Sequence, residues 1–270
     1  MKRHGYKFPC MKTTRPIAIT SVMVKILDRT LLEKIRPIIL GSTSKCNAGF
    51  KPEMSCELQL LRIHRAIEKN MKRNLPSYII AQDVKSGYNN VVIEDLLKKF
   101  GEASNEYYNK LFQEEGAAEG DHSQEQEGLN HLLRYIVQTP RLRIWNESPD
   151  IMINKGVLQG SISSPYLFLF VADDLTKAVE KCGSDQEDPP LVSTWADDIT
   201  VVANSRTDAC RVIRTQLNVS QQINLPLSAK KAQLLIIYPK NYKGEKRKAG
   251  KYLERIRILK HVKVLGLIFQ

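Results

Sequence analysis

Long apolar runs are missing from this 270-residue sequence. The most apolar stretch, residues 166–172, is far shorter than the roughly 20 apolar residues that cross a bilayer. The basic residues 1–4 have no apolar segment behind them, so a secretory signal is also absent from the pattern. We therefore expect a soluble chain that does not act in a membrane.

Cysteine is scarce and scattered. The five cysteines lie at positions 10, 46, 56, 182 and 210, without the short paired spacing of a zinc knuckle or ribbon. The five histidines cluster neither with them nor with each other. An odd, dispersed set of cysteines fits a reducing compartment, which predicts an intracellular location.

Acidic residues are fewer than basic ones: the sequence has 29 Asp and Glu and 41 Lys and Arg, which gives a net charge of +12. Residues 114–128 hold six acids and no Lys or Arg, so the rest of the chain has 41 basic residues against 23 acidic ones. Such an excess indicates a polyanionic partner, although a soluble basic protein without one is the alternative. We expect residues 114–128 to form a surface loop or a disordered insertion.

Two neighbouring acids, Asp197 and Asp198, stand between apolar stretches rich in β-branched residues. This pattern predicts a hairpin with the acids at its tip. Adjacent carboxylates repel each other unless a cation compensates, and hard oxygen ligands suit Mg²⁺. A solvated turn is the alternative for this pair taken alone.

Two further blocks accompany the acid pair. Asp83 follows a short buried-strand pattern at residues 78–81, and a third carboxylate beside the hairpin could help to hold two divalent ions for phosphoryl displacement. Residues 156–165 form a glycine- and serine-containing turn, in which Ser164 before Pro165 indicates the start of a helix. A helix over residues 91–100, capped by Asn90, is also expected.

The order of these blocks resembles that of reverse transcriptases of non-LTR retrotransposons and group II introns. Seven motifs follow one another in the family's order: residues 15–19 with 25–27, residues 47–52 with 55–56, residues 83–88, residues 159–160 with 164–165, residues 196–198, residues 225–231 and residues 264–266. The resemblance implies an α+β right-hand polymerase fold and RNA-directed DNA polymerase activity.

The resemblance also implies the chemistry of the acids. Asp83 and Asp197 would bridge two Mg²⁺ ions, or Mn²⁺ in their place, while Asp198 supports them and a main-chain carbonyl near Val84 completes a metal shell. Lys231 would give a proton to the departing pyrophosphate. Lys230 is a rival for that role, and a solvated face is the plain alternative for both lysines.

Substrate-binding residues follow in the same way. Tyr88 occupies the position where the family places an aromatic ring that excludes a 2′-hydroxyl, and Gln159 and Gly160 would pack against the base and the template backbone. Arg15 and Lys25 are candidate cations for the incoming triphosphate, with ordinary surface charge as the alternative. The implied partners are an RNA template, a DNA or RNA primer and dNTPs. The sequence is compatible with a nuclear or a cytoplasmic location, and the family favours the nucleus.

The implied organisation is fingers over residues 1–77, a first part of the palm over 78–100, a fingers region or insertion over 101–150 and a second part of the palm over 151–270. The family's helical thumb would follow residues 264–266, so we expect no thumb in this chain. Three positions depart from the family pattern: Trp195 replaces a smaller aromatic, Asn89 replaces an acid, and a lysine-proline-glycine pattern before Arg15 is missing. An intron-maturase-like RNA-binding protein and a non-catalytic nucleic-acid scaffold are the alternative functions.

Overall fold

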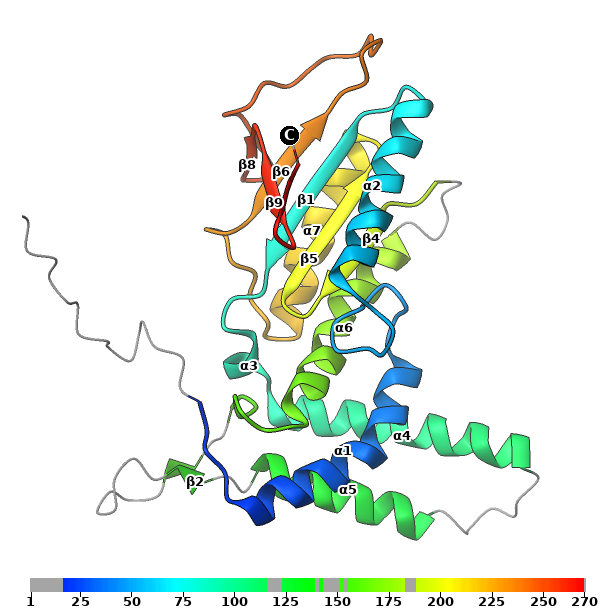
Figure 1. Cartoon of the computed structure of the whole chain (residues 1–270), viewed down its shortest axis with the longest axis vertical. Helices are drawn as coiled ribbons and strands as arrows, with labels where there is room; N and C mark the ends of the chain where they lie inside the picture. Colours follow the sequence, from blue (N-terminus) through cyan, green and yellow to red (C-terminus); the bar gives the residue numbers. More distant parts are fainter. Residues whose placement is uncertain are drawn as a thin grey trace, which may run out of the picture.

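The computed structural model describes residues 17–115, 123–138, 141–142, 151–152, 155–182 and 188–269. A sheet with helices against both of its faces forms one end of the molecule, and a layer of helices forms the other (Figure 1). Arg15 lies outside the described residues.

The helices are α1 (Val22–Ser42), α2 (Cys56–Lys72), α3 (Gly87–Asn90), α4 (Ile93–Glu115), α5 (Ser123–Gln138), α6 (Ser164–Cys182) and α7 (Arg206–Gln222). The strands are β1 (Ser77–Asp83), β2 (Arg141–Leu142), β3 (Ile151–Met152), β4 (Leu191–Trp195), β5 (Asp198–Ala203), β6 (Gln233–Ile237), β7 (Tyr252–Leu253), β8 (Ile256–Leu259), β9 (Val262–Val264) and β10 (Leu267–Phe269).

Strand β1 lies inside the main sheet, whose order is β4-β5-β1-β6-β8-β7. It pairs antiparallel with both β5 and β6, while β6 pairs parallel with β8. Alternate residues of β1 enter two different hydrophobic cores, Tyr78 and Ile80 on one face and Ile79 on the other. Burial on both faces explains why the strand is an apolar run rather than an alternating pattern.

The two cores bring the helices to opposite faces of the sheet. Helices α6 and α7 cover one face, in a core that continues into the layer formed by α1, α4 and α5. Ile63 and Ile67 of α2 pack on the other face together with Val262 and Val264 of the β9–β10 hairpin. None of the described helices combines the length and apolarity that crossing a bilayer demands.

Two sequence-based expectations are wrong in detail. Asn90 does not cap the next helix, because it is the last residue of α3 and its side-chain amide donates to the Lys85 carbonyl at 2.8 Å. Helix α4 begins at Ile93 and runs on to Glu115. The acidic stretch is not a loop throughout, because residues 114–115 end α4 and residues 123–128 begin α5, while residues 116–122 lie outside the described residues. Burial of Leu129, Leu133 and Val137, spaced four residues apart, holds α5 against the helical layer despite its acids.

Candidate active site

Strands β4 and β5 form the predicted hairpin, and Ala196 and Asp197 make its turn. Asp198 begins β5 and pairs with Trp195 across the turn. Ala196 has a φ of +54°, in the left-handed region that residues other than glycine rarely adopt. The surrounding chain must therefore hold this turn in place.

Residues 46–49 supply that support along β4. The Thr194 amide donates to the Cys46 carbonyl at 3.0 Å, and the Ala48 amide donates to the Thr194 carbonyl at 2.8 Å. Gly49 lies directly against the turn, since a Cβ built on it would approach the Ala196 nitrogen to 2.5 Å. A larger residue at position 49 would displace the turn that carries the acids.

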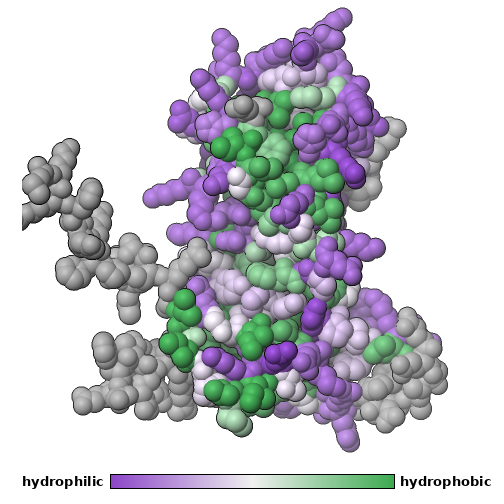
Figure 2. Space-filling model, viewed as in Figure 1, coloured by the Kyte–Doolittle hydropathy of each residue, from purple (hydrophilic) through white to green (hydrophobic). Residues whose placement is uncertain are grey.

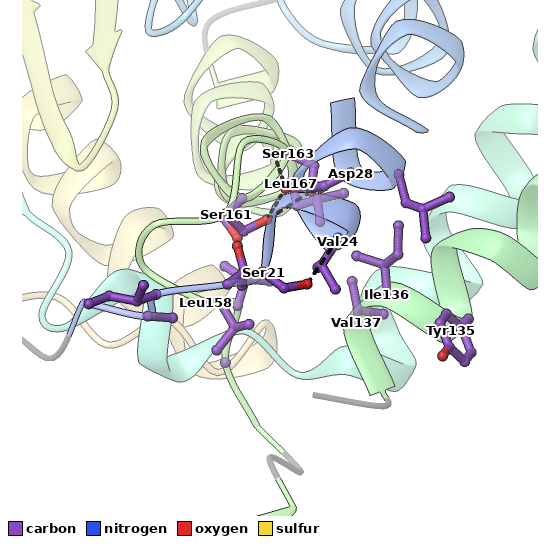
Figure 3. Close-up of a pocket in the computed structure, with 17 residues that line it drawn as sticks. Ser21, Val24, Asp28, Tyr135, Ile136, Val137, Leu158, Ser161, Ser163 and Leu167 are labelled. Carbon is purple, nitrogen blue, oxygen red and sulfur yellow. Dashed lines mark hydrogen bonds between the residues drawn. The ribbon is translucent and has the colours of Figure 1, made fainter. Parts of the chain in front are cut away.

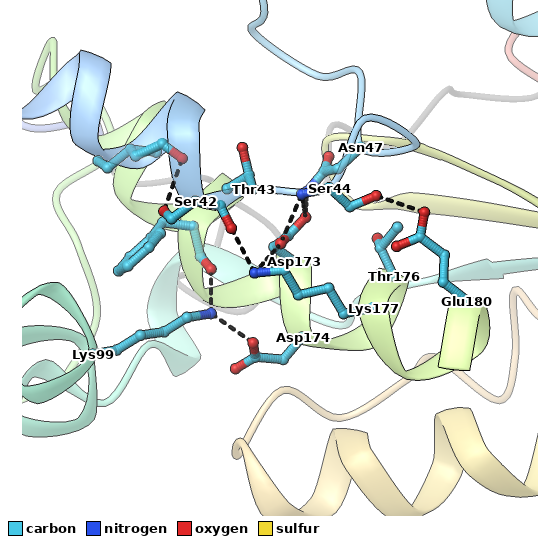
Figure 4. Close-up of polar contacts among 12 residues, drawn as sticks. Ser42, Thr43, Ser44, Asn47, Lys99, Asp173, Asp174, Thr176, Lys177 and Glu180 are labelled. Carbon is cyan, nitrogen blue, oxygen red and sulfur yellow. Dashed lines mark hydrogen bonds and ion pairs between the residues drawn. The ribbon is translucent and has the colours of Figure 1, made fainter. Parts of the chain in front are cut away.

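A buried carboxylate on α6, Asp173, anchors this supporting segment (Figure 4). Its oxygens accept hydrogen bonds from the Ser44 amide and the Asn47 side chain, each at 3.1 Å, and the Lys177 ammonium lies 3.1 Å away. Asp173 is fully buried, and a buried charge needs such partners. Sequence reasoning missed this residue, because Ser44 and Asn47 are more than 120 residues away from it along the chain.

The register of the sheet brings Asp83 to the same place. Asp83 ends β1 directly opposite Asp198, so the two side chains leave the same face of the sheet. The Val84 amide donates to the Asp197 carbonyl at 3.0 Å, which joins the chain after β1 to the hairpin turn. The three acids expected to act together therefore lie on adjoining elements at one end of the sheet.

Lys231 is the lysine beside these acids. Its ammonium lies 2.6 Å from Asp83 Oδ1, and the Asp83 carbonyl accepts from the Ser228 amide at 2.8 Å, which ties the preceding loop to β1. The hydrogen bond to Asp83 raises the pKa of Lys231, and the charges of Asp197 and Asp198 add to that effect. The rival Lys230 lines a different cleft.

Asp198 shows how strongly the acids interact. Partial burial raises its pKa to about 6, repulsion from Asp197 and Asp83 adds to the shift, and Lys231 opposes it. Within the described residues, no group of three or more His, Cys, Asp or Glu side chains is already arranged around a metal position. The donors nevertheless fit a hard divalent cation, because they are carboxylates short of compensating positive charge.

The raised pKa predicts that Asp198 destabilises the metal-free fold. Its ionisation is easier in the unfolded chain, with a pKa near 3.8, than in the folded one, so stability is lost as pH rises from about 4 through 6. Asp198→Asn should therefore stabilise the chain at pH 7 by about 1 kcal/mol, discounted because the side chain reaches solvent. Thermal unfolding without divalent ions should show a Tm gain at pH 7 that shrinks at pH 4. An equal gain at both pH values would contradict the electrostatic explanation.

Tyr88 lies close to the acids. Its ring stacks on Phe168 with centroids 5.0 Å apart and planes 17° from parallel. Burial raises the Tyr88 pKa to about 12, and the charge of Asp197 contributes, so the phenol stays protonated. Gly87 leaves no room for a side chain, since a Cβ there would lie 2.5 Å from the Phe168 ring. These contacts fix the direction of the Tyr88 ring.

The loop with Gln159 and Gly160 is joined to Tyr88 through the backbone. The Val157 amide donates to the Tyr88 carbonyl at 2.9 Å, and the Gln159 carbonyl accepts from the Ala18 amide at 2.7 Å. Lys25, by contrast, is exposed on α1 and forms no ion pair with a described residue. The structure therefore joins the loop to Tyr88, and it leaves the Lys25 side chain exposed on α1.

Asp28 is a second buried carboxylate that sequence reasoning missed (Figure 3). It accepts hydrogen bonds from the Ser161 hydroxyl at 2.7 Å, the Ile162 amide at 2.6 Å and the Ser163 hydroxyl. These bonds tie α1 to the loop before α6, beside a cavity of about 380 Å³. Asp28 thus links the helical layer to the loop that contacts Tyr88.

This sheet, with carboxylates at the ends of neighbouring strands, has the right-hand polymerase fold. Comparisons with known proteins agree with this assignment of the fold. Residues 2–269 match the family described as reverse transcriptase (RNA-dependent DNA polymerase). The chain is 24% identical over 222 residues to a retrovirus-related Pol polyprotein from type-1 retrotransposable element R2 of Popillia japonica, covering 81% of this chain and 29% of that protein.

Two solved telomerases from Candida tropicalis share the fold. One, in complex with the TWJ fragment of telomeric RNA, has a TM-score of 0.57 at 12% identity, covering 85% of this chain and 35% of that one. The other, an apo form truncated from the C-terminal domain, has a TM-score of 0.54 at 13% identity, covering 85% and 42%. The chain spans less than half the length of each of these relatives.

The chain therefore belongs to the reverse transcriptase family, whose members are RNA-directed DNA polymerases and hence nucleotidyltransferases. The sequence-based identification of the family and of the polymerase fold is confirmed.

Proposed function

We propose that this chain copies RNA into DNA by joining dNTPs to the 3′-hydroxyl of a DNA or RNA primer. One observation carries the proposal: Asp83, Asp197 and Asp198 lie on adjoining elements at one end of the sheet, in a chain of this family. Burial raises the pKa of Asp198, and the repulsion from Asp197 and Asp83 that adds to this shift supports a place that attracts cations. The net charge of +12 supports a nucleic-acid partner.

The cations best suited to these ligands are two Mg²⁺ ions, with Mn²⁺ as an alternative. Asp83 and Asp197 would hold both, Asp198 would support them, and a main-chain carbonyl near Val84 would add a ligand. When bound, the ions would activate the primer hydroxyl and neutralise charge on the triphosphate. Lys231 pairs with Asp83 Oδ1, so an ion held by that oxygen would compete with this ion pair.

The remaining residues would bind and orient the substrates. Lys231 has a raised pKa and stays protonated, so its ammonium can give a proton to the leaving pyrophosphate. Tyr88 would exclude a 2′-hydroxyl from the sugar site, and Gln159 and Gly160 would pack on the templating base pair. Arg15 and Lys25 would grip the triphosphate.

The organisation proposed for this activity places the fingers at residues 1–77 and 101–150 and the palm at residues 78–100 and 151–270. Helix α2, within the first range, packs on the sheet rather than in the helical layer. It would therefore act as part of the sheet's support. The telomerase neighbour bound to RNA supports an RNA partner here. The proposed location is intracellular, nuclear or cytoplasmic, and the family alone favours the nucleus.

A primer-extension assay tests this function. With an RNA template, an annealed DNA primer, dNTPs and Mg²⁺, the chain should lengthen the primer, and chelation of the metal should stop it. A maturase-like or scaffold protein would bind the same RNA without extending the primer. RNA binding without primer extension, in Mg²⁺ and in Mn²⁺, would overturn the proposal. The comparisons with known proteins favour neither a maturase-like protein nor a scaffold.

A further inference from the structure

A second cleft, of about 550 Å³, lies at the edge of the sheet beyond the acids. Its lining contains five basic side chains, one tyrosine and no acid: Lys230, Tyr252, Arg255, Arg257, His261 and Lys263. None of the four Lys and Arg side chains forms an ion pair with a described residue. Figure 2 shows hydrophilic residues along the flank of the molecule where β8 lies. The cleft therefore holds positive charge that the described part of the chain does not neutralise.

The β7–β8 hairpin builds one wall of this cleft. Ile256 and Ile258 of β8 enter the core, so Arg257 between them points outward. Tyr252 of β7 is directly opposite Arg257 in the register, and its side chain is 60% exposed. An aromatic ring and a guanidinium thus stand side by side on the outer face of an edge hairpin.

The tip of the hairpin has an unfavourable backbone. Glu254 and Arg255 form a two-residue turn with φ values of +44° and +68°, where type I′ turns favour asparagine and glycine. The Arg214 side chain of α7 contacts the Glu254 carboxylate at 2.8 Å and so fixes the tip. Glycine at position 255 would relieve the backbone strain, yet the turn carries an exposed arginine there. The strain therefore points to a role for the Arg255 side chain.

The cleft also adjoins the acids. Gln233 and Lys263 line both this cleft and the cavity of about 120 Å³ that contains Asp83, Asp198 and Lys231. A strand of nucleic acid at the polymerase site could pass from one to the other along Gln233 and Lys263.

We propose that this cleft binds a single strand of nucleic acid, with Arg255, Arg257 and Lys263 on its phosphates and the Tyr252 ring stacked on a base. Cations along a backbone together with an exposed ring recognise single strands, because a duplex hides its base faces. The proposed contacts are to phosphates and to a base face, which RNA and DNA share, so both should bind. This site goes beyond the proposed polymerase function and does not depend on the acids.

Binding of labelled single-stranded oligonucleotides to the full chain, followed by fluorescence anisotropy over a salt series, tests the site. Arg255→Gln with Arg257→Gln should weaken binding and reduce the slope of log affinity against log salt by about 0.7 for each phosphate that the protein no longer neutralises. Tyr252→Leu should weaken binding about tenfold without changing that slope. Lys72→Gln with Lys98→Gln, which removes two exposed charges from α2 and α4, is the matched control and should change little.

Arg255→Gly separates binding from folding. Glycine suits the positive φ, so this variant should melt at the same or a higher temperature than the parent while binding the single strand more weakly. A lower Tm together with weaker binding would assign Arg255 a structural role instead. Equal losses of affinity in the cleft and control variants, or tighter binding of duplex than of single strands, would overturn the proposal. All these measurements omit dNTPs, so their outcome is independent of whether the chain polymerises.

Discussion

Asp197→Asn is expected to reduce primer extension by about 10³-fold or more, because it removes a full charge from the proposed metal ligands. Asp83→Asn should do the same, and it also removes the partner of Lys231. Neither acid is expected to contact nucleic acid directly, so affinity for template–primer should barely change. Single-turnover extension rates, measured beside template–primer affinity, distinguish the two effects.

Asp95→Asn is the matched control for these two variants. It makes the same chemical change on the exposed surface of α4, away from the sheet, and should extend primers at the parental rate. The Asn variants should also need more Mg²⁺ for any residual activity. An Asp197→Asn protein that extends primers like the parent would show that the hairpin turn does not hold the catalytic ions.

The parts of the fold that local pattern determines were predictable. Residues 78–81 are an apolar run because β1 is buried on both faces, and the β-branched flanks of Asp197 and Asp198 make a hairpin. The start of α6 at Ser164 follows from the serine and proline there. In each case the deciding interactions lie within a few residues of the signal.

The errors arise where distant packing overrides local composition. The acids of residues 123–128 favour a loop by composition, yet Leu129, Leu133 and Val137 bury one stripe of α5 against α1 and α4. Those three residues, at helical spacing, were the signal for a helix and lay just beyond the acids. The helix predicted to end at Phe100 continues because Tyr108 also enters the core.

The same reasoning applies to the site. The motif order predicted that Asp83, Asp197 and Asp198 act together, and the register of β1 with β5 and the turn between β4 and β5 do place them side by side. Asp173 and Asp28 were invisible in the sequence, since each looks like an ordinary polar position on a helix. Their importance comes from partners on other elements: Asn47 for Asp173, and Ser161 and Ser163 for Asp28. Asp173 holds the segment beside the hairpin turn and Asp28 holds the loop beside Tyr88, and both roles can be recognised only in the three-dimensional structure.

Tyr88→Ala is expected to raise the use of ribonucleotides relative to deoxynucleotides by about 10- to 100-fold, the range that a change in pocket size supports. The ring is held by stacking on Phe168, so its removal should open space beside the proposed sugar site. The ratio of kcat/KM for an rNTP to that for the matching dNTP, on one template, measures the effect.

Tyr88→Phe separates bulk from chemistry in this experiment. It keeps the ring stacked on Phe168 and removes only a hydroxyl that stays protonated at neutral pH, so the ratio should remain parental. If Tyr88→Phe relaxed selection as much as Tyr88→Ala, the hydroxyl rather than the ring would exclude ribonucleotides. If neither variant changed the ratio while both still extended primers, the sugar would lie elsewhere, and Tyr88 would serve mainly to hold the loop through the hydrogen bond between its carbonyl and the Val157 amide.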